Sequence, residues 1–297
     1  LVLVNPLYRL HARRAMSDVP CEAFLLLGLL AALWVWRRSH FGRFGVPALV
    51  VTSLGGICLG LSLSSKLSGM LGFMVVGIWL GVGVLARFSW GALGKYAAAV
   101  TGMTLVAATL FVGLNPFFTA RPAGITPPAV ATIAQASPWK RFVMTYQLRI
   151  DVSTSQQSLF AHNALATPWD KVTTTAAQGF GRFGPFGPAH SDSTLRFDWT
   201  QDFGGALWLP WVVLGACWAW ARGRAQHREG EPPTAWAVLA QFVLTLMVVT
   251  AYVPMAWDRY FLAIQAPSAL LAAGLAVAVI QYLRDHVKRR RSAEVVG

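Results

Sequence analysis

Three arginines and two acids stand where the chain enters its first long apolar run. The segment RLHARRAMSDVPCEAFLLLGLL, residues 9–30, contains Arg13, Arg14, Asp18 and Glu22. Asp18 and Glu22 are four residues apart and share one face if the helix has begun by Asp18. Both acids also have a purely structural explanation. Asp18, in the first turn, would complement the helix dipole, and Glu22 would pair with an arginine. Carboxylates at membrane depth nevertheless mark functional sites by default, because burying them is costly.

Other charged candidates lie in short connections between apolar runs. Lys66 stands among three serines in SLSSKLSG, and an ammonium with nearby hydroxyls can hold a phosphate. A lysine at the end of a span also extends to lipid headgroups without any further function. Asp258, Arg259 and Tyr260 follow Trp257 in AWDRYF. This segment is either an aromatic anchor at the membrane boundary or the place where Arg259 faces the same cavity as Lys66.

Two further segments hold weaker candidates. Asn115 and Pro116 close an apolar run and predict a helix stop, and the alternative for Asn115 is a contact with substrate. His162, in SLFAHNALATPWD, has no partner at metal-ligand spacing; it is either a hydrogen-bonded loop histidine or, with Gln156 and Gln157, a contact for a sugar or an acceptor. The sequence has no Gly-x-Ser-x-Gly, P-loop or His-Glu-x-x-His motif, which argues against a serine hydrolase, a nucleotide hydrolase and a zinc protease. It indicates no required cofactor and leaves a divalent metal open.

The composition predicts that a membrane positions these residues. Of 297 residues, 55% are hydrophobic and 12% are charged, and the mean hydropathy is +0.51. Soluble domains carry about 25% charged residues, and a spanning helix needs roughly 20 apolar ones. We therefore predict an all-α polytopic membrane protein with about seven transmembrane helices. The apolar runs are 19–36, 46–64, 67–86, 96–114, 205–221, 234–256 and 261–282.

The basic residues predict the orientation of the spans. Lysine and arginine gather in every second connection and in the C-terminal tail, which is typical of cytoplasmic loops. These residues are Arg37, Arg38, Arg43, Arg87, Lys95, Arg222, Arg224, Arg228, Arg284, Lys288, Arg289, Arg290 and Arg291. The net charge of +13 thus indicates membrane lipid rather than nucleic acid as the partner. This orientation places several basic residues on the outer side, where short loops avoid positive charge. The presence of Lys66, Arg259 and Arg13 or Arg14 there needs another explanation.

This orientation divides the chain into four regions. Residues 1–114 hold four spans, 115–204 form an extracytoplasmic loop region, 205–283 hold three spans, and 284–297 form a basic cytoplasmic tail. Within the loop region, PWKRFVMTYQLRI predicts a helix lying on the membrane surface. The three cysteines lie in apolar runs and predict buried, inert thiols. The chain begins with Leu1 in apolar sequence, so we expect an N-terminal part to be missing.

Taken together, four segments resemble the membrane glycosyltransferases of the GT-C fold, specifically the protein O-mannosyltransferases and their aminoarabinose transferase relatives. ARRAMSDVPCEAFLLL pairs Arg13 with Asp18, five residues later, at the opening of a span. GICLGLSLSSKLSGML ends a small-residue span in Lys66. LFVGLNPFF closes a span with Asn115, and MAWDRYFLAIQAPSALLAAGLAV opens a late span with Arg259 and its neighbouring tyrosine. Their order, sidedness and spacing agree over roughly residues 5–285.

The resemblance implies an inverting glycosyltransferase of protein or glycan O-glycosylation. Such enzymes move a mannose-like sugar from a dolichyl- or polyprenyl-phosphate carrier to a protein, lipid or glycan acceptor on the outer face. Lys66, Arg259 and Arg14 are the residues expected to bind the lipid phosphate. Asp18 and Arg13 are expected to be catalytic, with Asp18 orienting the acceptor or the sugar or holding an arginine.

The family's principal catalytic acid lies on the first outer loop, which on this resemblance precedes Leu1 and is the expected general base. The implied location is a bacterial inner membrane, with the active site on the extracytoplasmic side. Two other classes stay open from the residues alone. A polytopic transporter or permease also carries ionisable residues at its spans and basic inner loops, and a noncatalytic membrane subunit would fit the absent first loop.

Overall fold

The computed structural model describes residues 18–114, 132–133, 135–159, 161, 164–180, 208–256 and 258–296. These residues form helices and one isolated bridge, between Ala164 and Met255, and none of them forms a strand. The prediction of an all-α polytopic membrane protein is confirmed: within the described part, six helices are long and apolar enough to cross a membrane.

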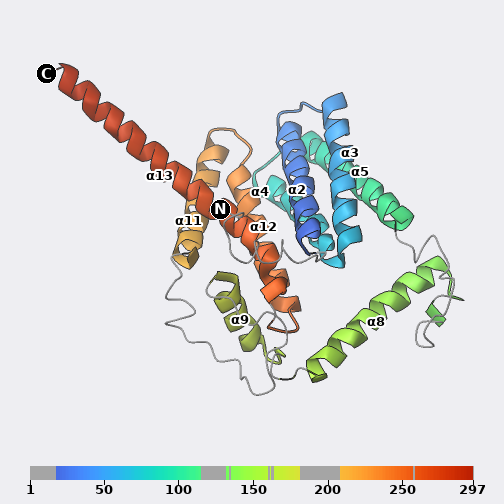
Figure 1. The fold of residues 1–297 in the computed structure, drawn as a ribbon. Coiled ribbons are helices and arrows are strands. Elements are labelled where there is room, and N and C mark those ends of the chain that lie inside the picture. Colours follow the sequence, from blue (N-terminus) through green and yellow to red (C-terminus); the bar gives the residue numbers. More distant parts are fainter. Residues whose placement is uncertain are drawn as a thin grey trace.

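The first part of the chain forms a bundle of four long helices (Figure 1). They are α2 (Asp18–His40), α3 (Val46–Ser65), α4 (Met70–Leu85) and α5 (Trp90–Leu114), and the short 3-10 helix η2 (Leu67–Gly69) precedes α4. α2 packs along α3, and α3 packs along α5. Each helix corresponds to one predicted apolar run.

The remaining elements form a second helical group and an extension at one end. α11 (Trp208–Arg228), α12 (Thr234–Tyr252) and α13 (Leu262–Val296) pack on one another, with the 3-10 helix η4 (Asp258–Phe261) between the last two. α8 (Pro138–Leu159) and α9 (Pro168–Phe180) lie beyond the ends of these helices (Figure 1). The predicted surface segment PWKRFVMTYQLRI therefore does form a helix, the first part of α8.

Two predicted spans differ from the helices found. The run at 205–221 corresponds to α11, which is 21 residues long but is not among the six sufficiently apolar helices, because tryptophans dilute its hydropathy and Arg222 and Arg224 follow. The last span is predicted to end at 282, and α13 continues beyond that point without a break to Val296. Residues 284–296 thus belong to the same helix as the span, and their assignment to a basic cytoplasmic tail stays a prediction.

Indole hydrogen bonds join the two helical groups. Trp36 Nε1 donates to the carbonyl oxygen of Trp79 at 3.0 Å, and Trp79 Nε1 donates to that of Ala237 at 2.8 Å. Both indoles are buried. Within a bilayer no water can replace such a bond, so these contacts fix α2 to α4 and α4 to α12.

Glycine allows α3 and α5 to approach to backbone contact. A Cβ atom on Gly56 would lie 2.8 Å from the carbonyl oxygen of Met103 and 2.8 Å from Cβ of Val106. One turn later, a Cβ atom on Gly60 would lie 3.0 Å from Cα of Ala107. Small residues at such contacts let helix backbones pack closely in membranes, and this packing fixes the end of α3 next to α2.

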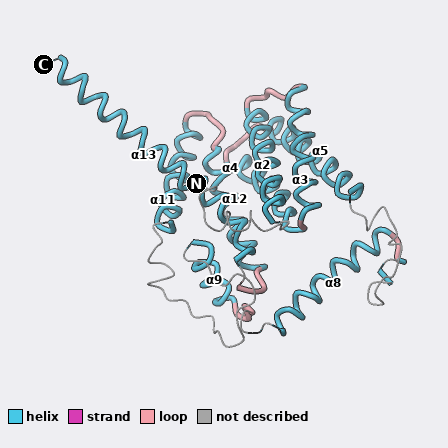
Figure 2. The backbone as a smooth tube through the Cα atoms, viewed as in Figure 1, coloured by secondary structure: helices cyan, strands magenta, loops and turns pink. Residues whose placement is uncertain are grey.

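The two helical groups together, which we call the bundle from here on, have two chemically different ends. The connections 41–45, 86–89 and 229–233 meet at one end, which we call the basic end (Figure 2). There His40 Nε2 lies 3.1 Å from the carbonyl oxygen of Gly230, its ring lies 4.3 Å from that of Phe88, and Lys95 Nζ donates to the carbonyl oxygen of Gly42 at 3.2 Å. The opposite end, the site end, holds Asp18, the α3–η2 connection and residues 253–261.

Candidate functional site

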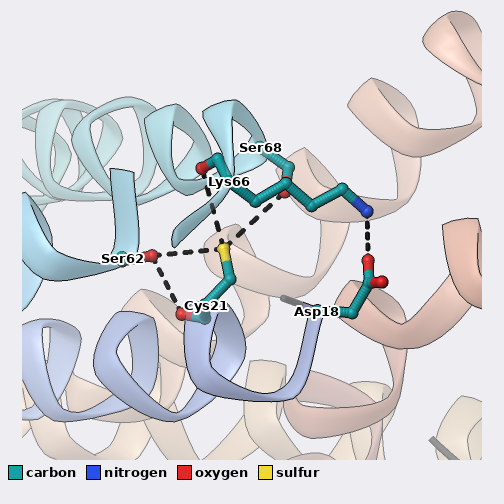
Figure 3. A network of polar contacts seen from close by, with 5 residues as sticks. All are labelled: Asp18, Cys21, Ser62, Lys66 and Ser68. Carbon is teal, nitrogen blue, oxygen red and sulfur yellow. Dashed lines mark hydrogen bonds and ion pairs between the residues drawn. The ribbon is translucent and has the colours of Figure 1, made fainter. Parts of the chain in front are cut away.

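An ion pair between Asp18 and Lys66 lies at the site end. Asp18 is the first residue of α2, and Lys66 is the only residue between α3 and η2. The Lys66 ammonium donates to the Asp18 carboxylate (Figure 3). The side chain of Asp18 is 9% exposed and that of Lys66 is 28% exposed. The carboxylate is therefore enclosed, while part of the lysine remains accessible to a ligand.

The backbone at Lys66 explains why the lysine reaches Asp18. Its extended conformation, with φ −160° and ψ 140°, ends α3 and starts η2. The Lys66 amide donates to the carbonyl oxygen of Ser62 at 3.0 Å, and the Gly69 amide donates to that of Lys66 at 2.9 Å. The turn is therefore closed on both sides, and Lys66 is the residue in it that carries a charged side chain to α2.

A polar cluster around Cys21 holds this turn against α2 (Figure 3). Ser62 Oγ donates to the carbonyl oxygen of Cys21 at 2.9 Å. The Cys21 sulfur lies 3.4 Å from Ser62 Oγ and 3.7 Å from Ser68 Oγ, and it donates to the carbonyl oxygen of Lys66 at 3.9 Å. The thiol contacts are weak individually, but together they attach the first turn of α2 on both sides of Lys66.

Glu22 adds a second carboxylate to the site. It lies one turn beyond Asp18 in α2 and is 6% exposed, and the charges of Lys66 and Asp18 both act on its carboxyl group. The two acids that the spacing predicts on one helix face are thus both buried beside one lysine. Two carboxylates near one ammonium leave the described group short of positive charge, which a further cation or proton would offset.

Tyr260 brings a third element to the site. Lys66 Nζ lies 6.0 Å from the centre of the Tyr260 ring, the outer limit for a cation–π contact. Tyr260 belongs to η4, as do Asp258 and Arg259. The last two are described by their backbone alone, so the prediction that Arg259 faces the same cavity as Lys66 stays a prediction, although η4 does lie beside Lys66.

The α12–α13 connection is attached to the extension at the site end. The Leu165 amide donates to the carbonyl oxygen of Pro254 at 3.1 Å, next to the bridge between Ala164 and Met255. Gln157 Nε2 donates to the same Pro254 oxygen at 3.1 Å. Gln157, a candidate contact for sugar or acceptor, therefore uses one side-chain amide hydrogen to bind the backbone that leads to η4.

Helix α9 is fixed to the same helix ends. Gln265 Nε2 of α13 donates to the carbonyl oxygen of Gly179 at 2.7 Å in a buried contact. Lys171 Nζ donates to the carbonyl oxygen of Ala251 at 2.7 Å. α9 thus covers the ends of α12 and α13 next to η4.

The start of α9 is closed by a reciprocal cap. Asp170 Oδ2 accepts from the Thr167 hydroxyl at 2.6 Å and from the Thr167 amide at 3.0 Å, while the Asp170 amide donates to Thr167 Oγ1 at 3.1 Å. This is the capping-box arrangement. The Thr167 hydroxyl, and then the Thr167 amide, hold the pKa of the Asp170 carboxyl below its usual range.

We expect the first turn of α9 to open at low pH. Because the pKa is lowered in the folded protein, the cap stabilises α9 above the ordinary aspartate pKa and is lost as the pH falls through the lowered value. Thr167→Val removes the hydroxyl donor, so the loss should begin at a higher pH and amide exchange in the first turn should already be faster at neutral pH. Hydrogen-exchange mass spectrometry of residues 167–172 measures both effects.

Thr154→Val is the matched control for this variant. It removes a hydroxyl that donates to the carbonyl oxygen of Ile150, with no carboxylate acceptor. It should leave the exchange of α9 and its pH dependence unchanged. An unaltered pH dependence in Thr167→Val would contradict the cap.

Several predicted site residues lie outside the described residues. These are Arg13, Arg14, Asn115 and His162. Gln156 lies in α8, but its side chain is likewise not described. The prediction that Arg13 pairs with Asp18 therefore stays a prediction, and the partner that the structure does give to Asp18 is Lys66.

Sequence reasoning missed the cluster around Cys21. All three cysteines are predicted to be buried and inert, but Cys21 is buried among polar partners, Cys58 is half-buried and Cys217 is exposed. Spacing carried a usable signal: Cys21 follows Asp18 by three residues, and Ser62 precedes Lys66 by four. Cys21 therefore shares a helix face with Asp18.

The described residues contain no group of three or more His, Cys, Asp or Glu side chains that could hold a metal ion. No protein-family model matches the chain, and neither a curated protein nor a solved structure is significantly similar to it. The functional argument therefore rests on the chemistry of the site itself.

Proposed function

We propose that this multi-pass membrane protein is a glycosyltransferase that takes a mannose-like sugar from a polyprenyl-phosphate carrier and transfers it, with inversion, to a protein, lipid or glycan acceptor. The observation that carries the proposal is the partly accessible Lys66, held by Asp18 beside Tyr260 at the end of the bundle away from the basic connections. A cation at that position suits a lipid phosphate, whose headgroup lies at the membrane boundary.

We assign Lys66 the role of stabilising the phosphate that leaves the sugar. When the bond between the sugar and the phosphate breaks, negative charge develops on the phosphate oxygens, and a preorganised cation stabilises it most effectively where water is scarce. Lys66 meets this requirement because it is fixed by Asp18 and is about three-quarters enclosed. Arg14 and Arg259 are assigned to the same phosphate on the family resemblance.

Asp18 is assigned to the positioning of Lys66, and Glu22 to the charge balance of the site. A separate general base must take the proton of the acceptor hydroxyl. On the family resemblance that base is an acid of the first outer loop, with Arg13 acting together with Asp18. The extension formed by α8 and α9 is assigned to acceptor selection, as loops mounted on a rigid scaffold commonly are.

The positive charge of the basic end supports a cytoplasmic assignment for that end, and we therefore assign the site to the extracytoplasmic side of a bacterial inner membrane. The test uses the complete natural protein in membrane vesicles, given labelled polyprenyl-phosphate mannose and an acceptor peptide. The proposal expects label on the acceptor with inverted anomeric configuration. Transport of a labelled solute without transfer would favour a permease, and neither activity would favour a noncatalytic subunit.

Asp18→Asn is expected to lower the transfer rate by about 10- to 100-fold, because small misplacements of a catalytic group have effects of this size. Labelling of Lys66 by a water-soluble amine reagent should increase at the same time, because the ammonium is no longer held. Lys95, bonded at the basic end, is the internal control for labelling. A lower rate with unchanged labelling of Lys66 would argue against the positioning role of Asp18.

A further inference from the structure

Helix α13 is longer than a membrane is thick. It has 35 residues, whereas the other candidate spans of the described chain have 19 to 25. At 1.5 Å per residue α13 is about 52 Å long, against roughly 30 Å of hydrocarbon. The helix therefore extends past the hydrocarbon, and it runs obliquely to α2 and α3 in Figure 1.

The two halves of α13 have different surroundings. Toward the site end its residues are buried against α9, α11 and α12, as Leu271 at 1% exposure illustrates. Toward the basic end, Ile280 and Tyr282 are 63% and 69% exposed. Figure 1 shows this part projecting from the bundle beyond α11. Its apolar side chains therefore lie in the lipid rather than against another helix of the described chain.

Positive charge is concentrated where this projecting part leaves the hydrocarbon. Arg284 and Lys288 are exposed and lie four residues apart, on one helix face. Arg289, Arg290 and Arg291 follow in the same helix, and Asp285 is the only acid among residues 284–291. The exposed rings of Tyr282 and His286 stack beside these basic residues, with their centres 6.2 Å apart. Aromatic groups are expected at a headgroup boundary.

Other arginines at the basic end are already engaged within the bundle. Arg222 lies 3.7 Å from the Glu229 carboxylate, and the Arg224 guanidinium lies 5.4 Å from the centre of the Trp220 ring. The basic residues of α13 lie farther along the chain, on the part that projects away from these helices. Their position and charge are complementary to phosphate groups in the adjacent leaflet.

We infer that the projecting part of α13 is a binding site for anionic phospholipid, with acyl chains along Ile280 and Leu283 and the headgroup phosphate at Arg284 and Lys288. This site is distinct from the Lys66 site, which lies at the other end of the bundle. It does not depend on the proposed glycosyl transfer. It would anchor the projecting end of α13 by charge as well as by apolar contact.

Native mass spectrometry of the delipidated protein, titrated with phosphatidylglycerol and separately with phosphatidylcholine, tests the inference. The wild type should bind the first phosphatidylglycerol more tightly than the first phosphatidylcholine. The double variant Arg284→Gln/Lys288→Gln should weaken phosphatidylglycerol binding by about fivefold for each charge removed, with little change for phosphatidylcholine.

The matched control is Arg222→Gln/Arg224→Gln, which removes two charges from the same end of the bundle. It should retain the preference for phosphatidylglycerol, and thermal unfolding should show both double variants to be folded. Three outcomes would overturn the inference: no preference in the wild type, wild-type binding in the α13 variant, or an equal loss in both double variants.

Discussion

Replacing Lys66 with methionine is expected to lower the rate of sugar transfer by about 10²- to 10³-fold, the usual effect of removing one preorganised group that stabilises transition-state charge. Methionine keeps much of the length of the side chain but cannot neutralise a departing phosphate. The loss should appear in kcat as well as in KM for the polyprenyl-phosphate donor, because the charge on the phosphate grows as the bond breaks. Labelled transfer in membrane vesicles measures both constants.

Lys66→Met also leaves Asp18 and Glu22 without their cation, and an unpaired buried carboxylate destabilises a protein. The double variant Lys66→Met/Asp18→Asn removes the Asp18 part of this difficulty and should fold while remaining inactive. Lys95→Met, at the basic end, is the control and should keep full activity. If the folded double variant transfers sugar at the wild-type rate, Lys66 is not part of the transfer site.

Gly56→Val is expected to lower the free energy of unfolding by about 3 kcal/mol, at the upper end of the range for overpacking a well-packed contact. The first added carbon would lie 2.8 Å from the Met103 carbonyl oxygen. Because that oxygen belongs to the backbone of α5, it cannot move aside like the end of a flexible side chain. α3 and α5 must separate instead, which also displaces the turn that carries Lys66. Unfolding in detergent, followed by tryptophan fluorescence, measures the change.

Gly77→Val is the control because it makes the same substitution in a neighbouring span, where an added Cβ would meet nothing within 4 Å. Its effect should stay within about 0.5 kcal/mol, as for an exposed site. Equal destabilisation by both variants would mean that a β-branched residue in the helix, rather than the α3–α5 contact, causes the loss.

The apolar runs predict the helices because a bilayer leaves the backbone few alternatives, but they predict the helix ends less well. α5 begins at Trp90 rather than at 96, where the apolar run begins. The reason is local: Ser89 Oγ accepts from the Ala92 amide at 3.2 Å and caps the helix before the hydrocarbon starts. α2 likewise continues through Arg37 and Arg38 to His40, since a helix need not end where the apolar environment ends.

The site could be predicted residue by residue but not as a pair. Asp18 and Lys66 each stand out, one as an acid at membrane depth and the other as a base against the charge bias. Their pairing depends on the packing of α2 along α3, which the spacing of charges within one segment does not encode. The family resemblance instead suggests Arg13 as the partner of Asp18, and this pairing stays a prediction.

The Asp18–Lys66 pair also constrains how the protein is made. The two residues are 48 positions apart, so at roughly 5–20 residues per second the ribosome adds Lys66 about 2–10 s after Asp18. During that interval α2 carries its two acids without Lys66, which arrives at the end of α3. Insertion of the α2–α3 hairpin is thus complete only when Lys66 is present, and a chain that stalls before Lys66 leaves Asp18 and Glu22 without this partner.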